Sequence, residues 1–527
     1  MSTTLEVQSP DSQAPGGVLV DRTPFCLRLP RVIPAFVALI GGLFWSYSYQ
    51  RLHHTDLWGH LAYGRIICET SSLPATEPLM PLAEGVPLVD TAWLAQVLGY
   101  RVMAQWGPAG VQFLHAATIA ACLALVAGGL YRRTHSFLFS VLGLGLFETL
   151  NWFQFQIVRP QMGGLVCFTL LTSLLTTRRW HKLHWVAIPT TLAIWANLHG
   201  SFIVGLVLLG CATIGRGVDV WRRTNRVSSM FRDRHARRLL LTTELAAAAT
   251  LLNPYGLRLY AEVLSFSGNQ NLQDLIEWNS LNFRSMQGQL AAGTALALAI
   301  VYRLSPRRVS AGELLALVVL GAAGMWSARM LIWWTPLAVA CFVLHAHAAW
   351  RRFHPLVNFQ PPVRSGKWAV VTVGLVWICF AWTPFGLHLL HGKTIDLKRC
   401  VSAHTPVAAT AWLREHPPTG QVFNTYEWGD YLLWQGPPHL KIFVDSQAHL
   451  VPREVWRDYM AVISVMSGWN DNFDRYGVQT IIIDKAERGA LIAKLKDDTH
   501  WKRRYEDSLA VIFTRQTATT TPEKPHP

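Results

Sequence analysis

Long apolar runs separated by short polar linkers occupy residues 32–390. A helix needs about 20 apolar residues, and roughly 17 at the least, to cross the hydrocarbon core of a bilayer. Several runs are short, but the pattern predicts an all-α membrane bundle of about eleven spanning helices. The predicted spans are 32–50, 108–130, 137–158, 160–177, 183–198, 201–215, 239–252, 289–302, 312–328, 331–349 and 368–390.

Basic residues gather in linkers on one side of this predicted bundle. Cytoplasmic loops carry an excess of Lys and Arg, and a cytoplasmic N-terminus puts all of these linkers on the cytoplasmic side. We therefore predict a multi-pass protein of the inner (plasma) membrane, with a cytoplasmic tail at 1–31 and a first outer loop at 51–107. The basic linkers are 131–133, 178–182, 216–238, 303–308 and 350–352.

The composition supports lipid as the solvent. Only 15% of the residues are charged, and the mean hydropathy is +0.23, whereas a soluble domain carries about 25% charged residues. The formal charge of +15 could indicate a nucleic-acid partner. We exclude nucleic acid because the basic residues form short clusters between apolar runs, as the positive-inside pattern requires.

Residues 391–515 are predicted to form a small extracytoplasmic α/β domain. Short runs rich in Val and Ile indicate buried strands, and helices are expected at 407–415 and 427–434. A tail at 516–527, with Pro, Lys and Thr, is predicted to be disordered. The predicted strands are 420–423, 441–444, 478–483 and 510–513.

The first outer loop holds the main candidate for chemistry. Asp56 directly follows the first span, and in a helix it shares a face with His60, four residues later. A carboxylate at that depth should face protein or a water-filled cavity, where it could act as a general base toward a hydroxyl group. The alternative is that Asp56 caps the helix that follows. The residues leave both roles open.

Other polar residues fall on the same predicted face. Arg159 could hold a phosphate by paired hydrogen bonds or simply anchor the interface, and Arg329 is a second phosphate candidate. Asn197 and His199 could bind sugar hydroxyls or a phosphate, with helix-end capping as the alternative. A metal site of Asp56 with nearby histidines (His53, His54 and His60) is a further alternative, although no HExxH pattern is present.

The order of motifs in the first loop resembles GT-C glycosyltransferases, membrane enzymes that use polyprenyl-phosphate-linked sugars. An acid follows the first span, a Leu-Pro turn and an acidic-Pro step come next, and V-D-x-x-W-L enters a second amphipathic run. The family includes protein O-mannosyltransferases and lipid A aminoarabinose transferases. The resemblance implies that Asp56 is the catalytic acid and that Asp90 is a second polar position. Many members pair two acids here, but Leu57 and Trp58 follow Asp56, so a need for Mg or Mn stays open and no other cofactor is expected.

Motifs elsewhere resemble an uncharacterised bacterial branch of that superfamily. They are V-R-P-Q at 158–161, W-A-N-L-H-G at 195–200, L-N-P-Y-G at 252–256 and N-T-Y-E-W-G-D-Y-L-L-W at 424–434. With the polar residues of the same predicted face, the expected substrate-binding set is Asp90, His60, Arg159, Gln161, Asn197, His199 and Arg329. Tyr426, Glu427, Asp430 and Asp445 could form an acceptor-facing surface, although Trp428, Tyr431 and Trp434 are expected to be core.

The function implied by this resemblance is transfer of a sugar from a polyprenyl-phosphate-linked donor to an extracytoplasmic lipid, glycan or protein acceptor. One displacement with Asp56 as the base would invert the anomeric carbon. The alternatives are a transporter for envelope polysaccharide and a non-catalytic assembly or partner-binding membrane protein. A transporter is less favoured because the sequence lacks an evident internal repeat and its polar residues gather at one face.

Overall fold

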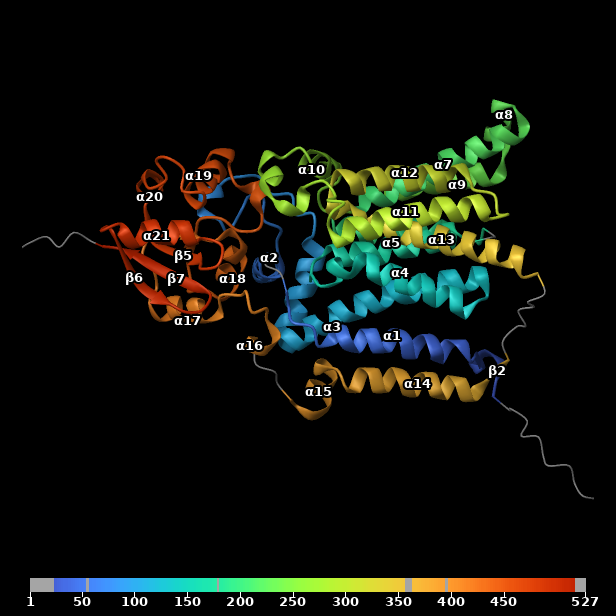
Figure 1. Cartoon of the computed structure of the whole chain (residues 1–527), viewed down its shortest axis with the longest axis horizontal. Coiled ribbons are helices and arrows are strands. Elements are labelled where there is room, and N and C mark those ends of the chain that lie inside the picture. The colour runs from blue at the N-terminus through green and yellow to red at the C-terminus, as the bar shows by residue number, and fades with distance from the viewer. Residues whose placement is uncertain (1–22, 54–55, 178–179, 356–362, 394–396, 517–527) are drawn as a thin grey trace, which may run out of the picture.

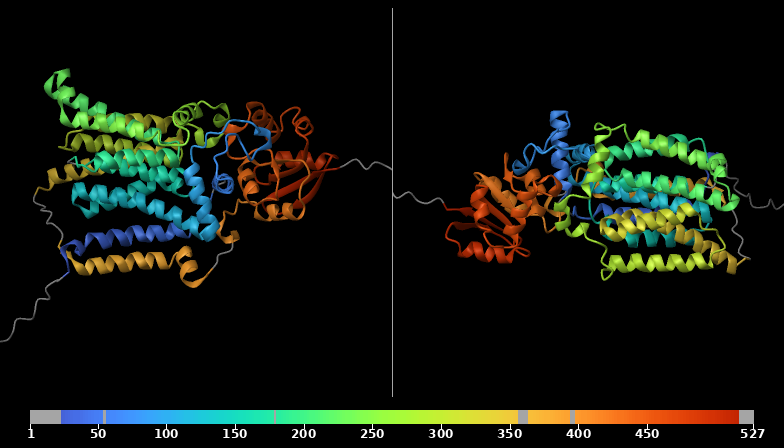
Figure 2. Two further views of the ribbon diagram at one scale, coloured as in Figure 1. Left: turned by 180° about the vertical axis from the view of Figure 1, so that it is seen from behind. Right: turned by 90° about the horizontal axis from the view of Figure 1, so that it is seen from above.

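Helices that run side by side form one part of the molecule, and a small α/β domain covers one end of them (Figure 1). The computed structural model describes residues 23–53, 56–177, 180–355, 363–393 and 397–516. The tail predicted at 516–527 and most of the tail predicted at 1–31 lie outside these residues, as does His54. The two further views confirm that the domain sits at the end of the bundle and not along its side (Figure 2).

Each predicted span except the last coincides with one helix of the bundle. The helices are α1 (Val32–Ser48), α3 (Trp93–Thr134), α4 (Phe137–Phe155), α5 (Gln161–Leu175), α6 (His184–Leu198), α7 (Phe202–Thr224), α9 (Arg234–Ala249), α11 (Met286–Leu304), α12 (Ala311–Trp326), α13 (Leu331–Phe353) and α14 (Gly366–Ala381). By length and composition, α3, α7 and α13 with the turn before it qualify as single spans among the described residues, while α1, α5 and α12 are apolar but shorter. The number of spans therefore stays a prediction.

The last predicted span is wrong as a single helix. Residues 368–390 fall in two helices, α14 and α15 (Pro384–His391), which meet at an angle of 87°. Pro384 has no backbone N–H to continue the first helix. Thr383 instead caps the second helix, since its Oγ1 accepts a hydrogen bond from the backbone N of Gly386 at 2.9 Å.

The bundle core surrounds α13, whose side chains are buried along most of its length. Trp333 is fully buried among aromatic neighbours that include Trp195 and Phe168. Thr335 exchanges hydrogen bonds with Asn151 of α4, at 2.9 and 3.0 Å. Polar bonds of this kind fix how two helices pack where no water can replace a lost partner.

The C-terminal domain is built on a five-stranded mixed sheet of order β4-β3-β5-β7-β6. β3 is parallel to β4 and β5, whereas β7 is antiparallel to β5 and β6. The strands are β3 (Gln421–Asn424), β4 (Lys441–Ile442), β5 (Val478–Asp484), β6 (Trp501–Glu506) and β7 (Ala510–Arg515). The helices are α16 (Leu397–Cys400), α17 (Val407–Glu415), α18 (Tyr426–Gln435), α19 (Arg453–Ile463), α20 (Asp471–Arg475) and α21 (Gly489–Asp497).

Two outer segments of the bundle dock this domain. α2 (Asp56–Thr70) follows α1 and packs against α18, so closely that a Cβ on Gly59 would lie 2.6 Å from Asp430 Oδ1. Between α9 and α11, the chain forms α10 (Arg258–Phe266) and short 3-10 turns, where Asn271 Nδ2 donates to the carbonyls of Ala448 and Val451 at 2.8 Å. The remaining short elements are α8 (Val227–Arg232) and the β1–β2 pair (Leu29–Pro30, Arg364–Ser365).

Candidate functional site

A cavity of about 610 Å³ lies between the bundle and the C-terminal domain. Its walls come from α2, residues 88–96, the turn after α6, the segment 262–278, the turn before α13 and the C-terminal domain. The predicted site residues that line it are Asp56, His60, Asp90, His199, Arg329, Tyr426 and Glu427. Residues far apart in the sequence thus converge on one space.

An unbroken chain of ion pairs runs along the bundle side of this cavity. Asp56 Oδ2 lies 2.8 Å from Arg159 Nε, and Arg159 Nη2 lies 2.8 Å from Glu277 Oε2. Glu277 Oε1 in turn accepts a hydrogen bond from Arg329 Nη1 at 2.7 Å. Arg159 is buried and does not line the cavity, whereas Arg329 does. The two arginines expected to hold a phosphate are therefore joined by a carboxylate.

Glu277 is the site residue that sequence reasoning missed. Burial raises the pKa of this carboxyl, but Arg329 and Arg159 outweigh burial, so its pKa lies below the usual value. Arg329 also lies over the ring of the neighbouring Trp278, 5.1 Å from its centroid. In the sequence, Glu277 is a single acid beside a tryptophan in a long loop. This pattern is too common to mark Glu277 as a site residue.

A second polar chain fixes the neighbouring wall. Gln96 Nε2 donates to Asp90 Oδ1 at 3.0 Å and lies 3.2 Å from His60 Nδ1, while the backbone N of Ala92 donates to the same Asp90 oxygen at 2.9 Å. Burial lowers the pKa of His60 to about 4, so its imidazole is neutral at pH 7. Burial also raises the pKa of Asp90 to about 7. His60 therefore acts here as a neutral hydrogen-bonding group, whereas Asp90 can gain or lose its proton near pH 7.

Asn197 and His199, at the helix break of residues 197–200, take different roles in the structure. His199 lines the cavity, and its Nδ1 lies 2.8 Å from Ser201 Oγ. Asn197 does not line it: its Oδ1 accepts from Trp93 Nε1 at 3.1 Å, and its Nδ2 donates to the Leu252 carbonyl at 2.9 Å. Asn197 thus ties α6 to α3 and to the end of α9, as the capping alternative expects.

The four predicted acceptor-facing residues separate into two pairs. Tyr426 and Glu427 line the cavity, and burial raises the pKa of Glu427 to about 7. Asp430 and Asp445 are fully buried beneath it, and each has one carboxyl oxygen without a hydrogen-bond partner among the described residues. Burial raises the pKa of both, and each is raised further by nearby carboxylates that include Asp56. The protonated form of both carboxyls is therefore favoured relative to an exposed aspartate.

Gln161 lies apart from the cavity, and the proposed metal ligands form no metal site among the described residues. Gln161 is buried at the first turn of α5 and does not line the cavity. Within the described ranges, no three His, Cys, Asp or Glu side chains are grouped so that they could hold a metal ion. His54, one of the three histidines considered as metal ligands, lies outside the described residues.

The fold matches solved membrane glycosyltransferases over nearly the whole chain. Arabinofuranosyltransferase AftD from Mycobacteria aligns with a TM-score of 0.51 and 14% identity, over 92% of this chain and 40% of AftD. The Archaeoglobus fulgidus oligosaccharyltransferase gives 0.53 and 11%, over 93% and 75% of the two chains. ArnT from Cupriavidus metallidurans, bound to undecaprenyl phosphate, gives 0.52 and 12%, over 93% and 99%.

The likeness identifies the fold class. The chain therefore has the fold of these glycosyltransferases, the GT-C fold that its motifs predict. No protein-family model and no curated protein matches the sequence. The chain spans 40% of the length of AftD and almost all of ArnT. At these identities the match establishes architecture, and activity has to be argued from the cavity.

Proposed function

We propose that the protein transfers a sugar from a lipid-linked phosphate donor to an acceptor hydroxyl in the cavity between bundle and domain. The observation that carries this proposal is the convergence of Asp56 and Arg329 on one space through Arg159 and Glu277. A carboxylate and a cation-rich wall are the two groups that such a transfer needs. ArnT, which shares the fold, has been solved with undecaprenyl phosphate.

In this proposal, Asp56 is the base. Its carboxylate accepts the proton of the acceptor hydroxyl as the oxygen of that hydroxyl forms a bond to the anomeric carbon. The bond between that carbon and the donor phosphate breaks, and the lipid phosphate leaves with the electron pair. One displacement inverts the anomeric centre. Arg159, at 2.8 Å, keeps Asp56 ionised and fixes its orientation.

Arg329 is the cation that faces the donor. It lines the cavity, whereas Arg159 is covered by Asp56 and Glu277. A guanidinium binds phosphate through paired hydrogen bonds, and a fixed cation stabilises charge that develops on the leaving phosphate. The carboxylate of Glu277 now holds Arg329, so we infer that a donor phosphate takes over this interaction when it binds.

The acceptor would enter from the side of the C-terminal domain. Tyr426 and Glu427 line that wall, together with the aromatic rings of Trp428 and Tyr431. Aromatic faces and hydrogen-bonding carboxyl groups can both hold a sugar or a polar peptide. The pKa of Glu427, near 7, leaves it able to donate or accept a hydrogen bond at neutral pH. The acceptor class is the part of the proposal that the cavity constrains least.

The test is release of labelled sugar from a polyprenyl-phosphate donor by the purified full-length protein in detergent. Transfer to an added acceptor, or slow hydrolysis without one, supports the proposal. If the protein binds the donor but releases no labelled sugar, even when the donor is in many-fold excess over the protein, a transporter or an assembly protein is favoured instead. The protein with Asp56→Asn is the matched control, since any contaminating transferase would keep its activity.

A further inference from the structure

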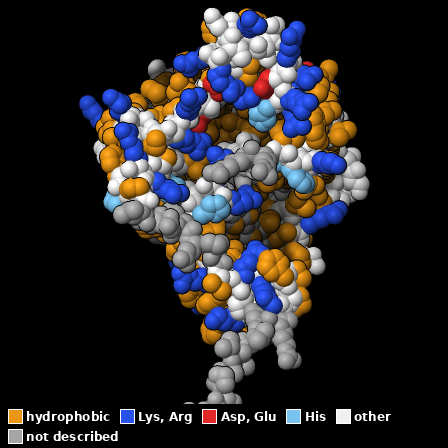
Figure 3. Space-filling view, turned by 90° about the vertical axis from the view of Figure 1, so that its right-hand side faces the viewer, with side chains coloured by type: hydrophobic (Ala, Val, Ile, Leu, Met, Phe, Trp, Pro, Cys, Tyr) orange, Lys and Arg blue, Asp and Glu red, His pale blue; other side chains and the backbone are white. Residues whose placement is uncertain are grey.

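A second cavity, of about 290 Å³, lies at the end of the bundle opposite the C-terminal domain. Helices α3, α5, α7, α9, α12 and α13 and the linker before α12 form its walls. Figure 3 shows this end of the molecule, where Lys and Arg side chains surround a hollow. The basic residues that line the cavity are Arg133, Arg216, His235 and Arg307.

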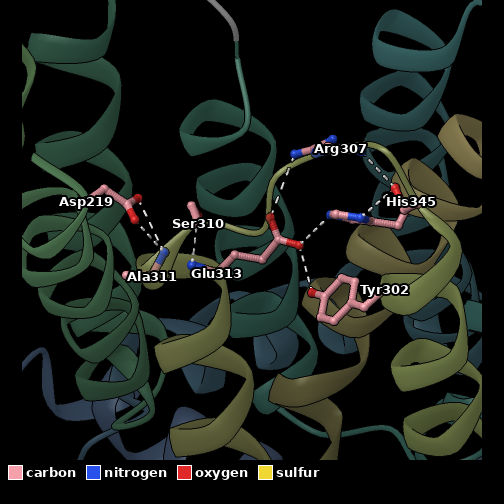
Figure 4. A network of polar contacts seen from close by, with 8 residues as sticks. Asp219, Tyr302, Arg307, Ser310, Ala311, Glu313 and His345 are labelled. Atoms are coloured by element: carbon pink, nitrogen blue, oxygen red, sulfur yellow. Dashed lines mark hydrogen bonds and ion pairs between the residues drawn. The ribbon is translucent and has the colours of Figure 1, made fainter. Parts of the chain in front are cut away.

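The carboxylates that line this cavity are already bound by the protein (Figure 4). Glu313 Oε1 accepts a hydrogen bond from Tyr302 Oη at 2.7 Å and lies 3.1 Å from His345 Nε2. Asp219 accepts from the backbone N of Ala311 at 3.1 Å, at the start of α12. These bonds hold both carboxylates in the wall of the cavity.

Arg307 is the most weakly held of the paired arginines here. The nearest carboxylate oxygen, Glu313 Oε2, lies 3.7 Å from its Nη2, beyond hydrogen-bond distance. It is the one carboxylate within 4 Å of that guanidinium in the part of the chain that the structure describes. Arg216, by contrast, bonds Asp233 through Nε at 3.0 Å and Nη2 at 2.8 Å. Arg307 therefore keeps donors for another anion.

Apolar surface continues from this basic cavity. A shallow pocket beside it shares Arg133 and residues of α5 and α13 with the cavity. Leu125, Val126, Leu130 and Pro336 supply its apolar lining, and Thr169, Thr172, Ser173 and Thr176 of α5 add hydroxyl groups; the pocket holds about 30 Å³. The basic cavity and this shallow pocket, here called the apolar seam, thus lie next to each other between α3, α5 and α13. A free phosphate or a nucleotide would bind in the basic cavity and leave the apolar seam empty.

We propose that this cavity binds the phosphate headgroup of an anionic phospholipid, with an acyl chain along the apolar seam between α3, α5 and α13. Basic pockets between membrane helices bind anionic lipid headgroups in this way. The site lies at the far end of the bundle from the 610 Å³ cavity and does not depend on sugar transfer. Its occupant would fill the gap between six helices and so stabilise the bundle.

Native mass spectrometry of the full-length protein, released from nanodiscs of phosphatidylglycerol or phosphatidylcholine, tests the proposal. We expect one phosphatidylglycerol to stay bound where phosphatidylcholine is lost. Arg307→Ala should weaken that binding about tenfold, because it removes the guanidinium that keeps donors for the phosphate. Arg133→Gln, from a different helix, should weaken it as well. Arg226→Ala, an exposed arginine outside the cavity, should not.

Three results would overturn the lipid site. They are equal retention of both lipids, equal retention by the wild type and both cavity variants, and loss of the bound lipid in millimolar inorganic phosphate. The last result would assign the cavity to a soluble phosphate. A variant that unfolds is recognised by its aggregated gel-filtration profile, and the remaining cavity variant then decides the matter.

Discussion

Arg159 Nε lies 2.8 Å from Asp56 Oδ2, which pairs the turn before α5 with the first residue of α2. Arg159 is buried and Asp56 is half-buried, and the other side of Arg159 is occupied by Glu277. The ion pair restrains the carboxylate of Asp56 at the edge of the cavity and so fixes the geometry on which the proposed transfer depends.

Glu277→Gln should strengthen binding of the donor. In the present structure, the Glu277 carboxylate occupies Arg329, and a neutral amide competes less well with a phosphate for that guanidinium. We expect the KM for the donor, or the inhibition constant of free polyprenyl phosphate, to fall about tenfold, because charged hydrogen bonds are worth roughly 1.5–3 kcal/mol. Unchanged or weaker donor binding would contradict the displacement of Glu277. Glu84→Gln, an exposed change in the first outer loop, is the control.

The buried carboxyls Asp430 and Asp445 should make stability fall as the pH rises. Burial raises the pKa of Asp445 from 3.8 to about 8 and that of Asp430 well above 3.8. Between those values, the folded state binds more protons than the unfolded state, so the free energy of unfolding decreases with pH. Thermal unfolding from pH 4 to pH 8 measures this effect. The double variant Asp430→Asn with Asp445→Asn should flatten the curve; an equally steep curve would refute the assignment.

Gly64→Ala should loosen α2 from α3. A Cβ at this position would lie 2.2 Å from the backbone oxygen of Gln96, which cannot move without the helix. Overpacking of this kind costs about 1–3 kcal/mol, and the melting temperature should fall accordingly. Gly128→Ala is the matched control, since a Cβ on this helical glycine of α3 meets nothing within 4 Å. Equal melting temperatures for the two variants would show that the helices are not in close contact.

The helices of the bundle were predictable because each contains an apolar run bounded by polar residues. The bend at Pro384 was missed, although the residue was visible, because a proline inside an apolar run often kinks a helix without ending it. Strand β6 was missed because it is the edge of the sheet, and its side chains are mostly exposed. Strands β3 and β5 were found because both of their faces are buried.

The site was only partly readable from the sequence. Asp56, His60, Asp90, His199 and Arg329 were chosen for their position at one predicted face, and the structure gathers them at one cavity. Glu277 could not be chosen, because its importance comes from two arginines that are distant in the chain and close only in the fold. The sequence also could not show that Glu427 lines the cavity whereas Asp430 and Asp445 are buried, because this difference arises from packing in the folded domain.

The most direct test of the central proposal compares sugar transfer by Asp56→Asn with transfer by the wild type and by Glu84→Gln, in the same detergent and at the same level of folding. A positioned base contributes about 10²–10⁴-fold to the rate. We predict a loss of that size for Asp56→Asn with donor binding retained, and a normal rate for Glu84→Gln. Transfer at the wild-type rate by Asp56→Asn would contradict the account.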